Sequence, residues 1–359
     1  MIVVIGGGPA SFSFAIKHRK LHPNDEIIIL EAGYKPLRKV LVAGGGKCNI
    51  LNDQYEEPVL NNLDYQKNLF TLENIELLRD FYTRDLGLVL LNINGYYYPS
   101  SLKGETVAYA LEKTARTLGI KVITEQHVIK IKKEAQGFSV ITKYQTVYQA
   151  DKIVLAVGSN LYYHEDFFNY PLFHDLELPS KPFVPFLSSL SVKEKLFSVK
   201  GIRARATVSL VINDQVVATK SGEIQFNDTN ISGIVVMNLA SILSWHETTI
   251  GELRIDFFDG LKVPSDYDLR ALLPLDLAAY LEENQQDPRN MVLHIIGLNP
   301  KNAQVASGGI LLEVLNKNYT VKKDPNIIVL GECLDVDGLC GGYNLMHAFL
   351  SGLIAGRDL

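Results

Sequence analysis

Residues 331–345, GECLDVDGLCGGYNL, bring three acids and four glycines together in one short stretch near the end of the chain. Carboxylates beside bare backbone suit either a metal-binding loop or a cradle for a cofactor. With Gly338 at the sixth position of a calcium loop, Cys333 and Asn344 occupy the first and twelfth positions, which require Asp and Glu. The stretch is therefore predicted to hold a cofactor, and no metal site is expected.

A second glycine-rich turn stands near the start of the chain. Gly6 to Ser11, GGGPAS, nearly match G-x-G-x-x-G, with Ser11 in place of the third glycine. The turn joins an apolar strand to a helical pattern, and a second apolar strand ends before Glu31, which is the order of a βαβ unit. Such a turn lets backbone and a helix N-terminus meet a pyrophosphate, while Glu31 accepts hydrogen bonds from a ribose. The acid favours FAD or NAD over NADP, and a plain βα turn is the alternative.

A third glycine-rich segment, Gly44 to Asn49 (GGGKCN), follows soon after Glu31. An enzyme that binds only NAD has no need of it, whereas in two-dinucleotide flavoproteins this stretch runs beside the flavin pyrophosphate and ring. Arg38, Lys39 and Lys47 could balance phosphate charge there. The alternative is a glycine-rich surface turn.

The C-terminal stretch can serve the same cofactor. Glu332 follows the strand NIIVL, where an acid would hold ribityl hydroxyls or cap the pyrophosphate through water. Gly341 to Leu345 are predicted to open a final helix that runs to about Gly356, with its amides and dipole facing the N1–C2=O edge of the flavin. The alternative is a structural turn held by side-chain bonds from Asp335 and Asp337.

These motifs resemble those of a known family. GGGPAS, LRKVLVAGGGKCNILN, YYPSS, SGGI and GECLDVDGLCGGYNL are similar to segments of the bacterial flavoproteins that include aminoacetone oxidase and BaiN-type NAD(P)/FAD-dependent oxidoreductases. The resemblance implies an FAD domain made from both chain ends, with a β-rich and a small helical insertion. It also implies that backbone at Val128 meets the adenine. The chain departs from the family pattern at Ser11, and at Lys47 and Tyr96, where arginine is usual.

The residues predicted to contact FAD come from four turns and from single positions near them. They are Gly6, Gly8, Pro9, Ala10, Ser11, Glu31, Ala32, Arg38, Lys39, Gly44, Gly45, Gly46, Lys47, Cys48, Asn49, Val128, Ala156, Gly158, Gly331, Glu332, Gly342, Tyr343, Asn344 and Leu345.

The source of electrons and the catalytic residue are less defined. No second strand–GxGxxG–helix unit occurs in the sequence, so the reductant is either a substrate bound over the flavin or NAD(P)H that docks transiently. This favours an oxidase or a small-molecule dehydrogenase. Cys48 lacks the second cysteine, five residues on, that dithiol chemistry requires. His347 and Tyr343 are more typical of packing or cofactor contact, so no catalytic base is assigned; Tyr96 to Tyr98 could line a pocket but are more typical of an edge strand.

The order of the expected strands and helices around these residues predicts an α/β fold with a two-dinucleotide-binding, Rossmann-like FAD domain. The expected parts are residues 1–182 and 302–359 for the FAD domain, 183–258 for a β-rich insertion and 259–301 for a small helical insertion. Four prolines between Pro171 and Pro185 are expected to break regular structure at the first boundary. Residues 73–86 and 104–119 show helical patterns, and Asn213-Asp214 is expected to form a hairpin turn.

Composition limits the partners. A net charge of −5 gives no electrostatic reason to expect nucleic acid or an anionic membrane, and no apolar run is long enough to span a bilayer. Three cysteines without a CxxC, and no signal peptide at the first residues, favour a reduced cytoplasmic protein. The expected function is an FAD-dependent oxidoreductase that acts on a small molecule between the FAD domain and the insertion. The alternatives are a flavin-binding or regulatory protein without turnover and, less favoured, an FAD-dependent RNA-modifying enzyme.

Overall fold

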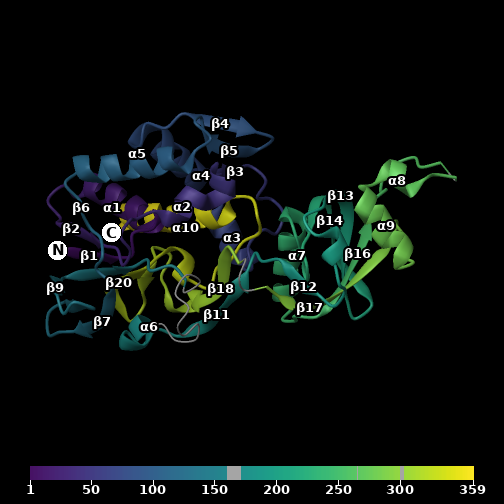
Figure 1. Ribbon diagram of the computed structural model, residues 1–359. Coiled ribbons are helices and arrows are strands. Elements are labelled where there is room, and N and C mark those ends of the chain that lie inside the picture. The colour runs from purple at the N-terminus through teal and green to yellow at the C-terminus, as the bar shows by residue number, and fades with distance from the viewer. Residues whose placement is uncertain (160–170, 265, 300–302) are drawn as a thin grey trace. The chain divides into compact units, whose positions relative to one another are not determined.

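The computed structural model describes residues 1–159, 171–264, 266–299 and 303–359 (Figure 1). The chain divides into two compact units: Met1–Val184 with Ser307–Leu359, and Pro185–Ala306. Within the described ranges, no helix is both long and apolar enough to cross a membrane.

A mainly parallel sheet forms the centre of the first unit, with strand order β19-β20-β10-β1-β2-β6. Strand β1 (Ile2–Ile5) pairs in parallel with β2 (Ile27–Leu30) and β10 (Lys152–Leu155), and β10 pairs with β20 (Asp324–Val329). β6 (Lys121–Ile123) extends one edge in parallel and β19 (Thr320–Val321) extends the other antiparallel. Every residue of β1 and β2 is buried, as expected for a parallel sheet covered on both faces. The predicted α/β class, with a sheet built from both chain ends, is confirmed.

Two long helices from opposite ends of the chain pack against each other: α1 (Pro9–Leu21) and α10 (Tyr343–Asp358). Two glycines of α10 allow this approach. A Cβ on Gly352 would stand 2.9 Å from the backbone nitrogen of Phe14, and one on Gly356 would stand 2.7 Å from the carbonyl oxygen of Phe14. Real Cβ contacts are longer, so the helices can lie this close only because those two side chains are absent.

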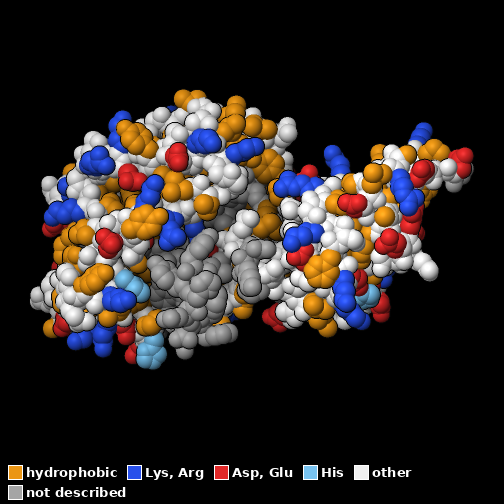
Figure 2. All heavy atoms as spheres, viewed as in Figure 1, with side chains coloured by type: hydrophobic (Ala, Val, Ile, Leu, Met, Phe, Trp, Pro, Cys, Tyr) orange, Lys and Arg blue, Asp and Glu red, His pale blue; other side chains and the backbone are white. Residues whose placement is uncertain are grey.

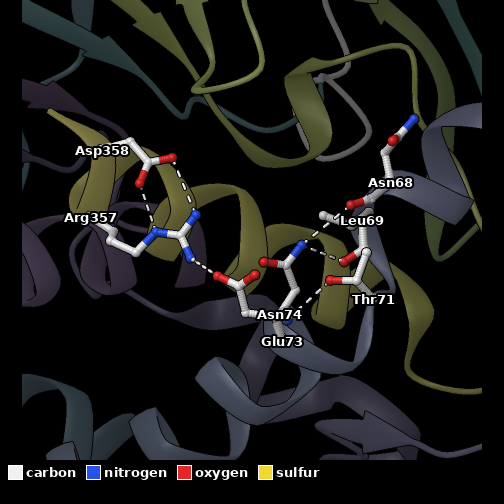
Figure 3. Close-up of polar contacts among 7 residues, drawn as sticks. All are labelled: Asn68, Leu69, Thr71, Glu73, Asn74, Arg357 and Asp358. Atoms are coloured by element: carbon white, nitrogen blue, oxygen red, sulfur yellow. Dashed lines mark hydrogen bonds and ion pairs between the residues drawn. The ribbon is translucent and has the colours of Figure 1, made fainter.

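The other helices of this unit include α2 (Arg38–Val42), the 3-10 turn Ala43–Gly46, α3 (Leu63–Leu69), α4 (Leu72–Asp80), α5 (Gly104–Thr117) and α6 (Pro171–Asp175). α4 continues into a π-helical turn, Phe81–Asp85, so the helical patterns predicted over 73–86 and 104–119 are confirmed. Figure 3 shows how α4 begins and where it meets the end of α10. The Thr71 hydroxyl accepts the backbone N–H of Asn74 at 3.2 Å, and Arg357 donates to Glu73 at 3.0 Å.

Two small antiparallel sheets flank the parallel one: β7 (Val128–Lys133), β8 (Phe138–Thr142) and β9 (Val147–Ala150), and β3 (Leu51–Asn52), β5 (Tyr96–Pro99) and β4 (Leu90–Ile93). β5 is the central strand of its sheet, so the expectation that Tyr96 to Tyr98 form an edge strand is wrong. β4 is joined to β5 by the tight turn at Asn94-Gly95, which is a local hairpin signal. β3 is distant in sequence, so its pairing with β5 leaves no such signal.

The second unit is a closed barrel with strand order β12-β15-β14-β13-β16-β17. Its strands are β12 (Leu190–Val192), β13 (Arg203–Ile212), β14 (Gln215–Phe226), β15 (Asn230–Ser232), β16 (Gly251–Asp256) and β17 (Met291–Leu298). The predicted turn joins β13 to β14, with φ of 50° at Asn213 and 62° at Asp214. Residues 259–301, expected to form a small helical insertion, supply α8 (Leu269–Leu272), α9 (Leu275–Glu283) and also β17, which pairs with β12 and β16.

Sequence reasoning missed one helix of the barrel unit. Residues 186–258 were interpreted as β-structure, but α7 (Ile234–Trp245) lies among them. Most of its residues are buried, so the apolar run is nearly continuous and shows little helical period, and β-branched residues at its start favour a strand.

The expectation that prolines break regular structure over Pro171–Pro185 is also wrong. Strand β11 (Ser180–Phe186) contains Pro182 and Pro185. It pairs, within the described residues, with β18 (Val305–Ile310) alone, and a strand with one neighbour tolerates a missing N–H.

Candidate functional site

The turn after β1 is held by the acid that ends β2. The Glu31 carboxylate accepts the backbone N–H of Gly7 and that of Gly33, both at 2.7 Å. The Ser11 hydroxyl donates to the Gly6 carbonyl, so the serine that replaces the third glycine ties the start of α1 to the turn. Segment 125–126 lies beside this acid, because the Gln126 N–H donates to the Glu31 carbonyl at 2.8 Å. Val128, at the start of β7, follows two residues later.

The start of α1 is open. Gly8 is its N-cap, no side chain of the described residues caps it, and no described atom lies within 4 Å of where a Cβ on Gly8 would stand. Pro9 has no N–H, and the N–H groups of Ala10 and Ser11 have no acceptor within the helix. These donors and the helix dipole favour an anion at this end.

The second glycine loop bends through the left-handed region. Gly44, Gly45, Gly46 and Cys48 have φ of 55°, 66°, 84° and 60°, and open space surrounds the Cβ position of Gly45. The Cys48 side chain is fully buried, and burial raises the pKa of its thiol to about 12. The thiol is therefore protonated at neutral pH and is not a nucleophile.

This loop lies directly against the N-terminus of α10. The side-chain amides of Asn49 and Asn52 both donate to the Gly341 carbonyl, at 2.8 and 2.9 Å. A Cβ on Gly342, the N-cap of α10, would stand 2.9 Å from the Asn49 carbonyl oxygen. Asn49 Oδ1 is buried and has no hydrogen-bond partner among the described residues. A buried acceptor of this kind requires a donor, and it stands beside an uncapped helix N-terminus.

The predicted residues at the start of α10 use their side chains locally. The Tyr343 hydroxyl donates to the Gln54 carbonyl, and the Asn344 amide bonds both the N–H and the carbonyl of Gly338. Their backbone N–H groups, with that of Leu345, lie in the first helical turn and have no acceptor within the helix.

A second acid joins the carboxyl ends of β10 and β20. Glu332 accepts the Ser159 hydroxyl at 3.0 Å and forms an ion pair with Lys39. Gly158 has φ of 68°, and a Cβ there would stand 3.9 Å from Glu332. Lys39, Gly158, Gly331 and Glu332 are thus brought together. Sequence reasoning missed Ser159, which follows the predicted Gly158, and Asn52, which ends the segment LRKVLVAGGGKCNILN.

The remaining predicted positions lie along the same elements. Arg38 begins α2, and one of its guanidinium nitrogens lies 3.9 Å from the Cβ position of Gly33; Ala32 connects Glu31 to Gly33. Lys47 is exposed at the end of the second loop. Ala156 follows β10, and its carbonyl is the closest atom to the Cβ position of Gly6.

The aspartates of the C-terminal stretch have structural partners. Asp337 is fully buried and accepts from Asn61 at 3.0 Å and from Ser307 at 2.7 Å, while Asp335 pairs with Lys181. Across the described ranges, no cluster of three or more His, Cys, Asp or Glu is arranged for a metal ion.

The arrangement fits an elongated, doubly charged dinucleotide with a polar ring at one end. Phosphate and ring oxygens suit the two helix N-termini, the two glycine-rich turns and the Lys39 ammonium. Hydroxyl groups suit the two carboxylates, and a ring N–H suits the Asn49 acceptor.

Comparisons with known proteins agree with this geometry. A family model described as the HI0933-like protein Rossmann domain matches residues 1–358. A 3-dehydro-bile acid delta(4,6)-reductase of Clostridium scindens is 27% identical, over 99% of this chain and 98% of the relative. A ribosomal RNA dihydrouridine synthase of Escherichia coli is 23% identical, over 99% of this chain and 97% of the relative.

Solved structures show the same fold. A 3-ketosteroid delta1-dehydrogenase from Sterolibacterium denitrificans has a TM-score of 0.54 at 10% identity, covering 99% of this chain and 98% of that one. A 3-ketosteroid-delta4-(5alpha)-dehydrogenase from Rhodococcus jostii RHA1 has a TM-score of 0.53 at 15% identity, covering 99% and 96%. At these identities the likeness concerns the fold alone.

Proposed function

This chain belongs to the HI0933-like Rossmann-domain family of FAD-dependent oxidoreductases, and we propose that it reduces a carbon–carbon double bond conjugated to a carbonyl group. The observation that carries the proposal is the chemistry common to the names of two relatives aligned over almost their whole lengths. A 3-dehydro delta(4,6) bile acid has double bonds next to a ketone. Dihydrouridine is formed when the double bond of uridine, which is next to a ring carbonyl, is saturated.

The residues at the site hold and orient the cofactor. The open N-terminus of α1, with Gly6, Gly8 and Ser11, would hold the pyrophosphate, because its amides and dipole favour negative charge. Each oxygen of Glu31 accepts one backbone N–H and keeps a lone pair for a ribose hydroxyl. Glu332 would hold the ribityl hydroxyls, and Lys39 offsets its charge.

The N-terminus of α10 would hold the flavin ring. Backbone N–H groups beyond Gly342 would favour negative charge on that ring, and Asn49 Oδ1 would accept a ring N–H. Bound FAD supplies the hydride, since flavins carry that chemistry and the protein positions them. The electrons come from NAD(P)H that docks transiently. The sequence leaves an oxidase, a dehydrogenase or a reductase open and favours the first two, whereas the names of these relatives favour a reductase.

A free small molecule is the preferred substrate, and uridine in RNA is the second candidate because the Escherichia coli relative is named for it. The net charge is −5. Figure 2 shows basic and acidic side chains interspersed over the described residues of the face in view, without a continuous basic stripe. RNA binding relies on such a stripe for most of its affinity.

The test is an anaerobic reoxidation experiment. The purified protein is reduced with NADPH or NADH and then mixed, without oxygen, with a 3-keto-4,6-diene steroid, 2-cyclohexenone or unmodified ribosomal RNA. Return of the oxidised flavin absorbance with either enone, and not with their saturated analogues, is expected. Reoxidation by the RNA alone identifies the second candidate. Reoxidation by oxygen alone indicates an oxidase, and a folded protein that binds no FAD indicates a different function; either result overturns the proposal.

A further inference from the structure

Gly331, two residues after the end of β20, forms hydrogen bonds with two side chains of α10. Its N–H donates to the Ser351 hydroxyl at 3.1 Å, and its carbonyl lies 3.2 Å from His347 Nε2. His347 and Ser351 are one helical turn apart and are both buried. Gly331 has φ of 68°, and a Cβ there would stand 3.0 Å from the Ala10 side chain, so α1 closes the other side.

The hydrogen-bond partners of His347 determine which of its ring nitrogens carries the proton. Burial lowers the pKa of His347 to about 4, so the ring is neutral at pH 7 and carries one N–H. The Gly331 carbonyl can only accept, which places that N–H on Nε2. Nδ1 then accepts the Tyr65 hydroxyl at 3.1 Å, and Tyr65 accepts the Tyr319 hydroxyl at 2.7 Å. Burial raises the pKa of both phenols, so each keeps its proton.

Gly331 comes directly before Glu332, which accepts a hydrogen bond from Ser159 and forms an ion pair with Lys39. The same helix carries Gly342 at its N-terminus, five residues before His347. One helix therefore determines the position of both the acid and the amides that face the cofactor. His347 itself contacts the Gly331 carbonyl and the Tyr65 hydroxyl.

We propose that His347 is a positioning residue: through the Gly331 carbonyl it holds Glu332 in register with the N-terminus of α10, and Tyr65 holds the ring in the tautomer that does so. The inference rests on the proposed cofactor site. It assigns a role to the buried hydrogen-bonded side chains of His347, Tyr65 and Tyr319. A residue in this role affects flavin affinity and potential together.

Three variants and a control test the inference. His347→Leu removes the donor, His347→Gln keeps an N–H donor of similar reach, and Tyr65→Phe removes the bond that orients the ring. Met346→Leu is the matched control, because Met346 is a fully buried neighbour on α10 and the change preserves its volume. The measurements are the FAD dissociation constant of the apoprotein, the flavin midpoint potential and the thermal unfolding of the apoprotein.

His347→Leu is expected to raise the FAD dissociation constant about 10-fold, the usual effect of one lost buried hydrogen bond, and to make the midpoint potential more negative. His347→Gln should remain within about threefold of wild type, and Tyr65→Phe should fall between the two. An unchanged dissociation constant and potential in His347→Leu and Tyr65→Phe overturns the inference, as does a change equal to that of Met346→Leu. If His347→Leu does not fold, Tyr65→Phe decides the matter. Wild-type protein that binds no FAD overturns the proposed function instead.

Discussion

The close packing of α1 and α10 makes Gly352→Ala an informative substitution. A Cβ at this position stands 2.9 Å from the backbone nitrogen of Phe14 and closer still to the carbonyl oxygen of Ala10. Both are helical backbone atoms, which cannot rotate away as the nearby Ser13 hydroxyl can, so the helices must separate by about 1 Å to restore ordinary contact. In an unobstructed helix the same change stabilises by about 1 kcal/mol, whereas overpacking a core costs about 1–3 kcal/mol or more. We expect a net loss of about 2 kcal/mol.

Thermal unfolding of the apoprotein measures this loss. A change of 1 kcal/mol shifts the midpoint by roughly 2–4 °C in domains of about 150–250 residues, so a decrease of about 4–8 °C is expected. Gly8→Ala is the control, since its Cβ meets no described atom within 4 Å and the apoprotein midpoint should stay the same. A Gly352→Ala protein with an unchanged or higher midpoint would show that the two helices are not held at this separation, and the reasoning would fail.

Three further outcomes follow from the same contacts. Gly8→Ala should weaken FAD binding at least 10-fold without loss of stability, because its methyl group occupies the space in front of the α1 amides; equal affinity in the two proteins would refute this. Burial raises the pKa of Cys48, Cys333 and Cys340 to about 12, so native protein at pH 8 should react with Ellman's reagent far more slowly than denatured protein; rapid native labelling would contradict the burial. The unfolded His347 binds a proton below about pH 6.5 and the folded one only below about pH 4, so stability should fall by up to about 3 kcal/mol as pH decreases through that range. Denaturant titrations at several pH values should show a smaller decrease in the free energy of unfolding for His347→Gln than for the wild type. An equal dependence of that free energy on pH in the wild type and the variant would count against this prediction.

The parts of the fold that the sequence predicts are those with a local signature. The strands β1 and β2 are continuous apolar runs, and glycines mark the turn at Gly6 to Ser11 and the start of the helix after Gly342; the structure contains all three. The convergence of the two chain ends follows because the carboxyl ends of parallel strands share one edge.

The contacts that the sequence does not predict join residues that are far apart in the chain. Ser159 and Glu332 are far apart in sequence and meet because β10 and β20 are neighbours. The contact between Tyr65 and His347 likewise has no pattern that short-range analysis can detect. α7 was missed because its all-round burial in the barrel unit removes the polar face by which a helix is recognised.

The two ends of the barrel unit lie side by side. The Gln304 N–H donates to the Leu187 carbonyl at 3.3 Å, and beyond it β11 and β18 continue as partners. Because Leu187 and Gln304 are hydrogen-bonded neighbours, a short turn between them could replace residues 188–303 and leave every strand of the parallel sheet intact. A deletion or insertion between residues 187 and 304 is therefore expected to leave the pairing of β1, β2, β10 and β20 unchanged.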